Sequence, residues 1–490
     1  MRHLKALSRG LRWAPVAALA LGACSPKATT AVTAPTAASA TSAAPATTAT
    51  APVPAAAPVG PAFQIPVEYY TLPNGLRVVL SPDHTAPTAT VAAYYAVGFR
   101  TEPRNRTGFA HLFEHLMFQG SQNLGKNEFI GLIQKNGGAL NGSTRFDFTN
   151  YYEVVPAHKL ETILWAEADR MRGLAINQSN LTNQQGVVKS EVRVNVLNQP
   201  YGSFPWIDMP MKANKNWNNA HNFYGDLKDL DAANLTDARS FFKTYYAPNN
   251  AVLAVVGDFE PAEAKAWVQQ YYGNIPSAPQ PPKPDLTEPR QEQEQRFAQD
   301  DKLATKPALA FAYHMPDRNT PEYYALIMLD QILLQGNDSR LYQALVQKRG
   351  YSDGVTGGIN SDLGNQFNYN GPMLWMGSLI YDPTVQADSV VRVLDQEINR
   401  LATSGITQTT LDLAMVKIRS SFYDQVNGSD NFGRADLLAS FALFDNDPGR
   451  INRLESEFRK VTPELMQKTI REYLRPTNRT IITVNPLAKS

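Results

Sequence analysis

The amino-acid sequence predicts an α+β fold made of two related halves. Strands cluster beside long helical stretches in each half, which favours α+β over a doubly wound sheet. A Pro-rich stretch, PSAPQPPKPDLTEP from Pro276, separates the halves, and similar segments occur in both. The chain has 490 residues, of which 43% are hydrophobic and 19% charged, and this is enough apolar material for two or three folded cores.

Two pairs of segments indicate that the halves arose by duplication. YYAPNNAVLAVVGD, which begins at Tyr245, and YLRPTNRTIITVNP, which begins at Tyr473, both place an aromatic residue, a proline and an asparagine before a β-branched strand. FEHLMFQG at 113–120 is similar to LDQILLQG at 329–336. Because both pairs keep the same order and similar offsets, we interpret them as the traces of an internal repeat.

The N-terminus has the pattern of an export signal. MRHLKALSRGLRW is basic, and PVAALALGAC follows it as an apolar run too short to span a bilayer. The run ends in LGAC, which resembles the bacterial lipobox. Residues 1–23 are therefore predicted to be a lipoprotein signal peptide, with Cys24, the chain's single cysteine, as the acylated residue. An ordinary secretory signal with a chance cysteine is the alternative. The sequence thus predicts a lipid-anchored protein of the bacterial cell envelope that faces the periplasm, and Ser25 favours the outer membrane.

Composition divides the rest of the chain. The segment after the signal is almost all Ala, Thr, Pro, Ser and Val, and it predicts a disordered tether because it has nothing with which to form a core. Residues 67–82 predict two short strands around a Pro-Asn-Gly turn, and 88–98 predict a third, mostly buried strand. The expected boundaries are 24–62 for the tether, 63–276 for an N-terminal domain, 277–296 for a linker and 297–490 for a C-terminal domain.

HLFEHLMFQG, residues 111–120, contains two of the chain's seven histidines. Flanking apolar residues place 111–118 on a helix, where residues three and four apart share a face, so His111, Glu114 and His115 point the same way. Two neutral imidazoles one turn apart suit zinc, with a third ligand from elsewhere and a fourth position open to water. Glu114 is placed to take a proton from that water and pass it on. The alternative is a helix with two histidines satisfied by hydrogen bonds.

The charge balance limits the partners of the protein. The 46 Lys and Arg residues against 45 Asp and Glu residues give a net charge of +1, which argues against nucleic acid as a partner. One cysteine excludes an internal disulfide. No motif points to a nucleotide, so zinc is the one cofactor that the sequence indicates.

The order H-x-x-E-H is the signature of the inverzincins, and the similarity extends beyond it. The chain resembles the pitrilysin and insulin-degrading-enzyme family, in the short two-domain branch that includes the mitochondrial processing peptidases. This resemblance implies two homologous α/β-roll domains that form a clam-like half chamber. It also implies a zinc metalloendopeptidase that cleaves extended or unfolded peptides with Glu114 as general base. The segments that carry it are GFAHLFEHLMFQG at 108–120, GGALNGSTRFDFTNYYEVVP at 137–156, WAEADRM at 165–171 and YYAPNNAVLAVVGDFEP at 245–261.

The resemblance also implies a third metal ligand, a glutamate on a second helix. VVKSEVR supplies Glu191, on a helix expected over 181–197. The alternative is a solvated helix carboxylate, and Glu153 and Glu167 are competing candidates. Many relatives carry another glutamate seven residues before the ligand, where this chain has Gln184. A neutral amide can still hydrogen-bond a ligand or water, so we expect support of the site to survive without its charge.

The hairpin at 137–156 is expected to present an edge strand close to the zinc helix. In the family, an extended substrate pairs with this edge through its backbone, so broad peptide specificity is expected. Asn141 matches a family residue near the substrate backbone and is therefore a candidate substrate-binding residue. The alternative is that Asn141 belongs to a turn, since Asn-Gly is a common turn pair.

The second half lacks the metal-binding set. Ile327, Asp330 and Gln331 stand at the repeat positions of His111, Glu114 and His115, so we expect this half to form a chamber wall. Active relatives also carry an Arg and a Tyr, seven apart, that hold the scissile carbonyl. In ALVQKRGYSDGV at 344–355 those positions are Val346 and Asp353.

The missing pair predicts a partner chain. In part of the short branch one chain carries zinc and a homologous chain carries the Arg/Tyr pair, and we expect this protein to be the zinc-bearing subunit of such a heterodimer. A homodimer with altered catalysis is the alternative, and a shifted register that uses Arg349 and Tyr351 has the wrong spacing. A second functional class stays open: a non-catalytic peptide-binding or scaffold lipoprotein of the same fold.

Overall fold

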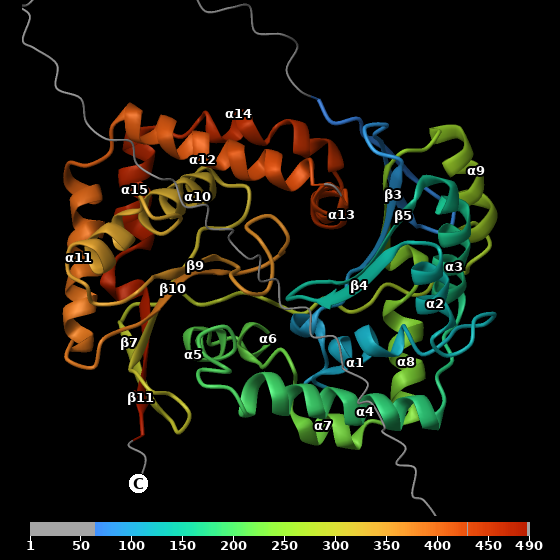
Figure 1. Ribbon diagram of the computed structural model, residues 1–490, viewed down its shortest axis with the longest axis horizontal. Coiled ribbons are helices and arrows are strands. Elements are labelled where there is room, and N and C mark those ends of the chain that lie inside the picture. The colour runs from blue at the N-terminus through green and yellow to red at the C-terminus, as the bar shows by residue number, and fades with distance from the viewer. Residues whose placement is uncertain (1–63, 429, 488–490) are drawn as a thin grey trace, which may run out of the picture. The chain divides into compact units, whose positions relative to one another are not determined.

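The computed structural model describes residues 64–428 and 430–487, whose strands form two mixed sheets (Figure 1). The predicted signal peptide, Cys24 and the tether lie outside these residues. The first sheet has the order β1-β2-β6-β3-β5-β4, and the second β7-β11-β8-β10-β9. The strands are Glu68–Thr71 (β1), Arg77–Pro82 (β2), Thr88–Tyr95 (β3), Ala139–Thr144 (β4), Thr149–Pro156 (β5), Ala251–Gly257 (β6), Gln295–Asp301 (β7), Ala308–His314 (β8), Thr356–Ile359 (β9), Leu374–Ile380 (β10) and Arg479–Pro486 (β11).

The two sheets repeat one topology. Without β1, both have the same strand order, with one parallel pair, β2 with β6 and β7 with β11, while the other neighbours are antiparallel. The matched asparagines also make the same bond: the Asn250 amide donates to Tyr245 O at 2.8 Å and the Asn478 amide to Tyr473 O at 2.7 Å. The predicted internal repeat is therefore confirmed, and so is the α+β class.

Helices cover the sheets and connect their strands. Short π-helical stretches at Arg193–Leu197 and Tyr342–Gln347 extend two of the connections. The helices are Phe109–Leu116 (α1), Glu128–Lys135 (α2), Leu160–Arg172 (α3), Gln178–Val192 (α4), Asp208–Ala213 (α5), Trp217–Ala220 (α6), Leu227–Ala232 (α7), Leu235–Tyr245 (α8), Pro261–Tyr272 (α9), Pro321–Leu333 (α10), Ala387–Thr403 (α11), Gln408–Val426 (α12), Phe432–Asp445 (α13), Leu454–Phe458 (α14) and Pro463–Tyr473 (α15).

Strand β3 is buried on both faces, and each face meets a different half of the chain. Because side chains alternate along a strand, Val91, Ala93 and Tyr95 belong to the core formed with α1 and α3, whereas Ala92 and Tyr94 belong to the core shared with α13. The Tyr94 hydroxyl donates to the Asp436 carboxylate on α13 at 2.8 Å. A helix from the second half thus covers the first sheet (Figure 1).

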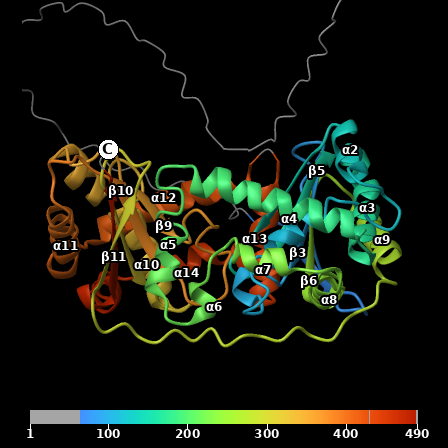
Figure 2. The ribbon, with the colours of Figure 1, turned by 90° about the horizontal axis from the view of Figure 1, so that it is seen from below.

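A helix of the first half likewise covers the second sheet: α5 packs on β8 and β11 (Figures 1 and 2). Met209 and Ala213 of α5 form an apolar cluster with Ala310 and Ile482 of the sheet. Each half therefore lends one helix to the sheet of the other. Because both contacts bury apolar side chains, they hold the two halves together.

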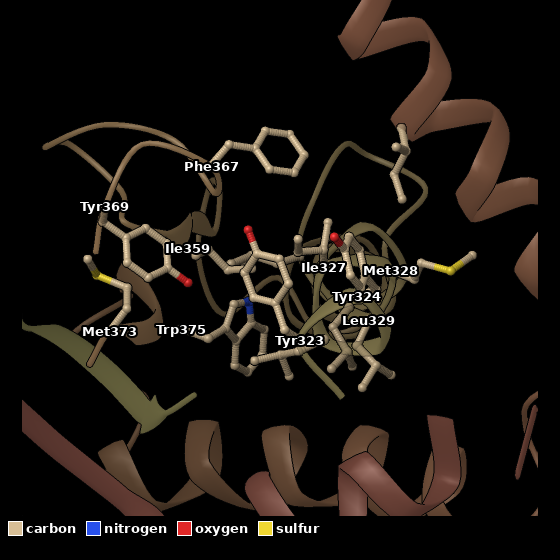
Figure 3. Packing of buried hydrophobic residues seen from close by; sticks show 14 of the residues in the cluster. Tyr323, Tyr324, Ile327, Met328, Leu329, Ile359, Phe367, Tyr369, Met373 and Trp375 are labelled. Carbon is tan, nitrogen blue, oxygen red and sulfur yellow. The ribbon is translucent and has the colours of Figure 1, made fainter. Parts of the chain in front are cut away.

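The position of His111 in the repeat is filled by a core residue in the second half. Ile327 on α10 is buried among aromatic side chains that include Tyr323 and Trp375 (Figure 3). Asp330, one turn further along, is buried and accepts a hydrogen bond from the Trp375 indole at 2.7 Å. At these repeat positions the second half therefore has core contacts.

The predicted linker has no regular structure over most of its length. Between the end of α9 at Tyr272 and the start of β7 at Gln295, the chain forms neither helix nor strand. The domain boundaries at 276 and 297 remain predictions. Over the described part of the chain, none of the helices combines the length and apolar character that crossing a membrane requires.

Asp330 should make the stability of the protein depend on pH. Burial raises its pKa to about 7, although hydrogen bonds from Trp375 and Gln335 and the charge of Lys417 act in the opposite direction. In the unfolded chain this carboxyl ionises at about pH 4. Between about pH 4 and about pH 7 the unfolded state therefore binds fewer protons, and the contribution of Asp330 to the free energy of unfolding falls as pH rises.

We expect Asp330→Asn to remove this fall. Urea denaturation across that window should show wild-type stability decreasing relative to the variant by up to about 4 kcal/mol. Asp353→Asn is the matched control because the Asp353 side chain is fully exposed. Parallel curves for wild type and Asp330→Asn would contradict the assignment.

Candidate metal centre and active site

Helix α1 carries the motif and is anchored at both its face and its start. Phe109, Leu112 and Phe113 are buried in the core under the first sheet. The carboxylate of Glu102 accepts hydrogen bonds from the backbone N–H groups of Gly108 at 2.8 Å and Ala110 at 2.6 Å. This carboxylate satisfies two donors at the helix N-terminus, where a negative charge is also favourable. The helix therefore presents its polar face in a fixed orientation.

The structure brings the two histidines of the motif together. The Nε2 atoms of His111 and His115 lie 3.2 Å apart, and the ring planes are nearly perpendicular, at 86°. His111 is buried, and its Nδ1 has no hydrogen-bond partner among the described residues.

Glu191 reaches the same point from α4. Its Oε2 lies 3.2 Å from His115 Nε2, and its Oε1 lies 3.7 Å from His111 Nε2. These three residues are the one group of metal-binding type found among the described residues, with ligand atoms within 4.8 Å of one another. In a tetrahedral zinc site the ligand atoms lie about 3.3–3.6 Å apart, because each is about 2.0–2.2 Å from the ion. The donor set and its spacing therefore fit zinc.

The environment shifts the pKa values of the three side chains in different directions. Burial lowers the pKa of His111, which favours the neutral imidazole. Burial also lowers the pKa of His115, but the hydrogen bond to Glu191 and the charge of Glu114 outweigh it and the net direction is upward. For Glu191, burial raises the pKa, but the hydrogen bond from His115 and the nearby imidazoles bring it below its usual range. Glu191 is thus held as a carboxylate.

Glu114 lies under the edge strand of the first sheet. Its Oε2 accepts a hydrogen bond from the Thr144 hydroxyl on β4 at 2.8 Å. A Cβ at Gly142 would lie 3.3 Å from Glu114 Cγ, so the strand passes close over this carboxylate. Strand β4 is the last strand in its sheet order. The expectation of an edge strand beside the zinc helix is confirmed.

Asn141 occupies the middle of β4, opposite Tyr152 of β5. Its side chain is exposed, and its Oδ1 accepts a hydrogen bond from the backbone N–H of Gly142 at 2.9 Å. The turn interpretation of this Asn-Gly pair is wrong, because pairing with β5 extends both residues. Asn141 therefore stands on the free edge of the sheet.

The two competing carboxylates form ion pairs inside the core. Glu153 and Glu167 are buried and both form ion pairs with Arg170, that of Glu153 at 3.0 Å. They are therefore not metal ligands. Gln184 is buried beside the site and is a hydrogen-bond partner of His115, so the amide does contact a candidate ligand as expected.

Two hydroxyl groups of the site were not found from the sequence. Thr144 holds Glu114, and the Tyr224 hydroxyl donates to Glu191 Oε1 at 3.0 Å. Thr144 lies in the hairpin of the family resemblance, where its spacing in β4 could have indicated it. Tyr224 lies between α6 and α7, outside every motif, and no local signal marks it.

The second half does not offer an Arg/Tyr pair in the 344–355 segment. The Asp353 side chain is fully exposed. Arg349 donates to Ala344 O at 3.0 Å and to the Gln396 side chain at 3.2 Å, and Tyr351 packs against the core of this half. The side chains that a shifted register could recruit are thus engaged within the second half.

Comparison with protein families identifies the class. Residues 77–218 match the family described as insulinase, peptidase family M16, and residues 232–416 match the peptidase M16 inactive domain. The chain belongs to peptidase family M16. The first match covers β2 to β5 with the motif helix, and the second runs from the end of α7 through β6 and into the second half as far as α12.

Individual relatives are similar to this chain over most of its length. The chain is 25% identical to the zinc protease PqqE of Helicobacter pylori over 433 residues, which is 86% of this chain and 93% of that protein. It is 21% identical to the mitochondrial-processing peptidase subunit beta of Saccharomyces cerevisiae over 369 residues, 73% and 78% of the two chains. The crystal structure of a protease from Helicobacter pylori matches 86% of this chain and 100% of its own, with a TM-score of 0.79 at 24% identity.

Proposed function

We propose that this protein is a zinc metalloendopeptidase that cleaves extended or unfolded peptides. The observation that carries the proposal is the convergence of His111, His115 and Glu191, whose ligand atoms come together from two helices. Relatives named zinc proteases support zinc as the ion. Zinc, when bound, supplies a Lewis acid and lowers the pKa of water in its open position toward neutrality.

Glu114 is the general base of the proposed reaction. Its Oε2 is engaged by Thr144, which leaves Oε1 to accept a proton from the attacking water and return it to the leaving amine. Strand β4 holds the peptide by backbone pairing along its free edge, with Asn141 beside it. Backbone pairing reads the extended shape of a peptide more than its side chains, which gives broad specificity.

The zinc-bearing chain works with a homologous partner that carries the Arg/Tyr pair. Support comes from the absence of that pair in residues 344–355 and from a relative that is named as one subunit of a peptidase. Acylation at Cys24 anchors the protein in the cell envelope facing the periplasm, in the outer membrane. This part rests on the sequence LGAC and on Ser25 after it.

Glu114→Gln tests the catalytic role. The variant should bind zinc as the wild type does, because Glu114 is not a ligand, and should lose at least about 100-fold in kcat because the base is gone. Zinc content by atomic absorption and cleavage of an unfolded peptide measure the two effects. Unchanged cleavage would favour the non-catalytic peptide-binding protein instead.

Thr144→Val tests how the base is oriented. The substitution keeps the shape of the side chain and removes the hydroxyl, so kcat should fall about tenfold with little change in KM or zinc content. Thr144→Ser restores a hydroxyl and should recover most of the activity. A loss that appears in KM instead would assign Thr144 to peptide binding.

The division of labour is tested by reconstitution. The chain should cleave an unfolded peptide poorly alone and well after mixing with a homologous chain that carries the Arg/Tyr pair, because the oxyanion donors are then supplied in trans. Size-exclusion chromatography of the mixture should show a complex of the two chains. Full cleavage by the solitary chain would refute the proposed heterodimer.

A further inference from the structure

Tyr224 contacts the candidate metal centre from a segment that lies outside both the helix of His111 and the helix of Glu191. It lies between α6 and α7, is 4% exposed, and packs with Val192 and Ile207 in a small apolar cluster. Its hydroxyl donates to Glu191 Oε1 at 3.0 Å. The other carboxylate oxygen, Oε2, is the one that lies 3.2 Å from His115 Nε2. Oε1, which accepts from Tyr224, also lies 3.7 Å from His111 Nε2, so the hydroxyl holds the oxygen that faces the buried imidazole.

The same ring forms part of the wall around His111. The ring centroids of Tyr224 and His111 lie 5.0 Å apart at an interplanar angle of 70°, and the neighbouring Phe223 ring lies 5.1 Å from His111 and 4.9 Å from Tyr224. Packing of both aromatic rings against His111 restricts the orientation of its imidazole.

The backbone of Tyr224 is itself fixed to the start of α1. A Cβ placed on Gly108 would lie 2.5 Å from Tyr224 O, so the two segments are in close contact there. One residue thus connects the start of α1, the carboxylate on α4 and the buried imidazole.

We propose that Tyr224 is a positioning residue of the metal centre, whose hydroxyl orients Glu191 and whose ring orients His111. This inference rests on the proposed function, because it takes Glu191 and His111 to be zinc ligands. In this proposal a neutral hydroxyl group, that of Tyr224, supports the carboxylate ligand Glu191. A second neutral group, the amide of Gln184, supports His115. Removing the hydroxyl should leave the fold intact and free Glu191 Oε1.

Zinc affinity of the full chain, measured by competition with a chromophoric chelator, tests the two contacts separately. Tyr224→Phe keeps the ring and should weaken zinc binding about 10- to 100-fold, the usual effect of losing such a support. Tyr224→Leu removes the ring as well and should weaken it further. Tyr271→Phe is the matched control, because the Tyr271 hydroxyl also donates to a carboxylate, that of Glu161 at 2.8 Å, and lies outside the site. It should bind zinc as the wild type does.

Two further measurements separate the outcomes. The melting temperature of each metal-free variant reports its stability, and Glu191→Ala reports whether Glu191 is a ligand. If Tyr224→Phe melts lower but binds zinc normally while Glu191→Ala binds it weakly, Tyr224 is merely structural and the inference is overturned, with the proposed metal site intact. If Glu191→Ala also binds zinc normally, the proposed site itself fails. Weak binding by both variants with unchanged melting temperature supports the inference.

Discussion

The angle between helices α1 and α4 is the constraint on which the metal centre depends, because the imidazoles come from one helix and the carboxylate from the other. Helix α4 packs directly on α1. The chain that follows α4 docks on the second sheet through Met209 and Ala213 of α5. Helix α13 of the second half covers the first sheet. The half that carries the candidate ligands is thus packed against the other half at two places.

Burial and neutral hydrogen-bond donors set the protonation and the orientation of the side chains at the site. Burial keeps His111 neutral, and Glu191 stays ionised because His115 hydrogen-bonds it. Hydroxyl groups hold one oxygen of each acidic residue, Thr144 on Glu114 and Tyr224 on Glu191. A neutral donor fixes a carboxylate without cancelling its charge, so the negative charge remains available to a cation and to a proton. This arrangement suits a centre that has to bind a divalent ion and still move protons.

Local signals in the sequence were enough to predict the motif helix, the first three strands, the hairpin and the repeat, because each depends on spacing within a short segment. Glu191 needed the family resemblance, since one glutamate on a polar helix looks like many others. Tyr224 and the exchange of α5 and α13 had no signal, because they depend on contacts between residues far apart in the chain. Asn141 was ambiguous for a related reason: whether Asn-Gly forms a turn or a strand is decided by pairing with β5.

The duplicated fold allows the site to be compared with the same position in the second half. The same position of the motif helix is buried in both halves, with Ile327 at 1% exposure in the second and His111 at 3% in the first. Burying isoleucine is favourable, whereas a buried imidazole has polar nitrogens whose loss of hydration has to be compensated. The second half thus has the arrangement that packing alone prefers. The first half keeps a histidine at the point where a second imidazole and a carboxylate converge, and this donor set fits zinc.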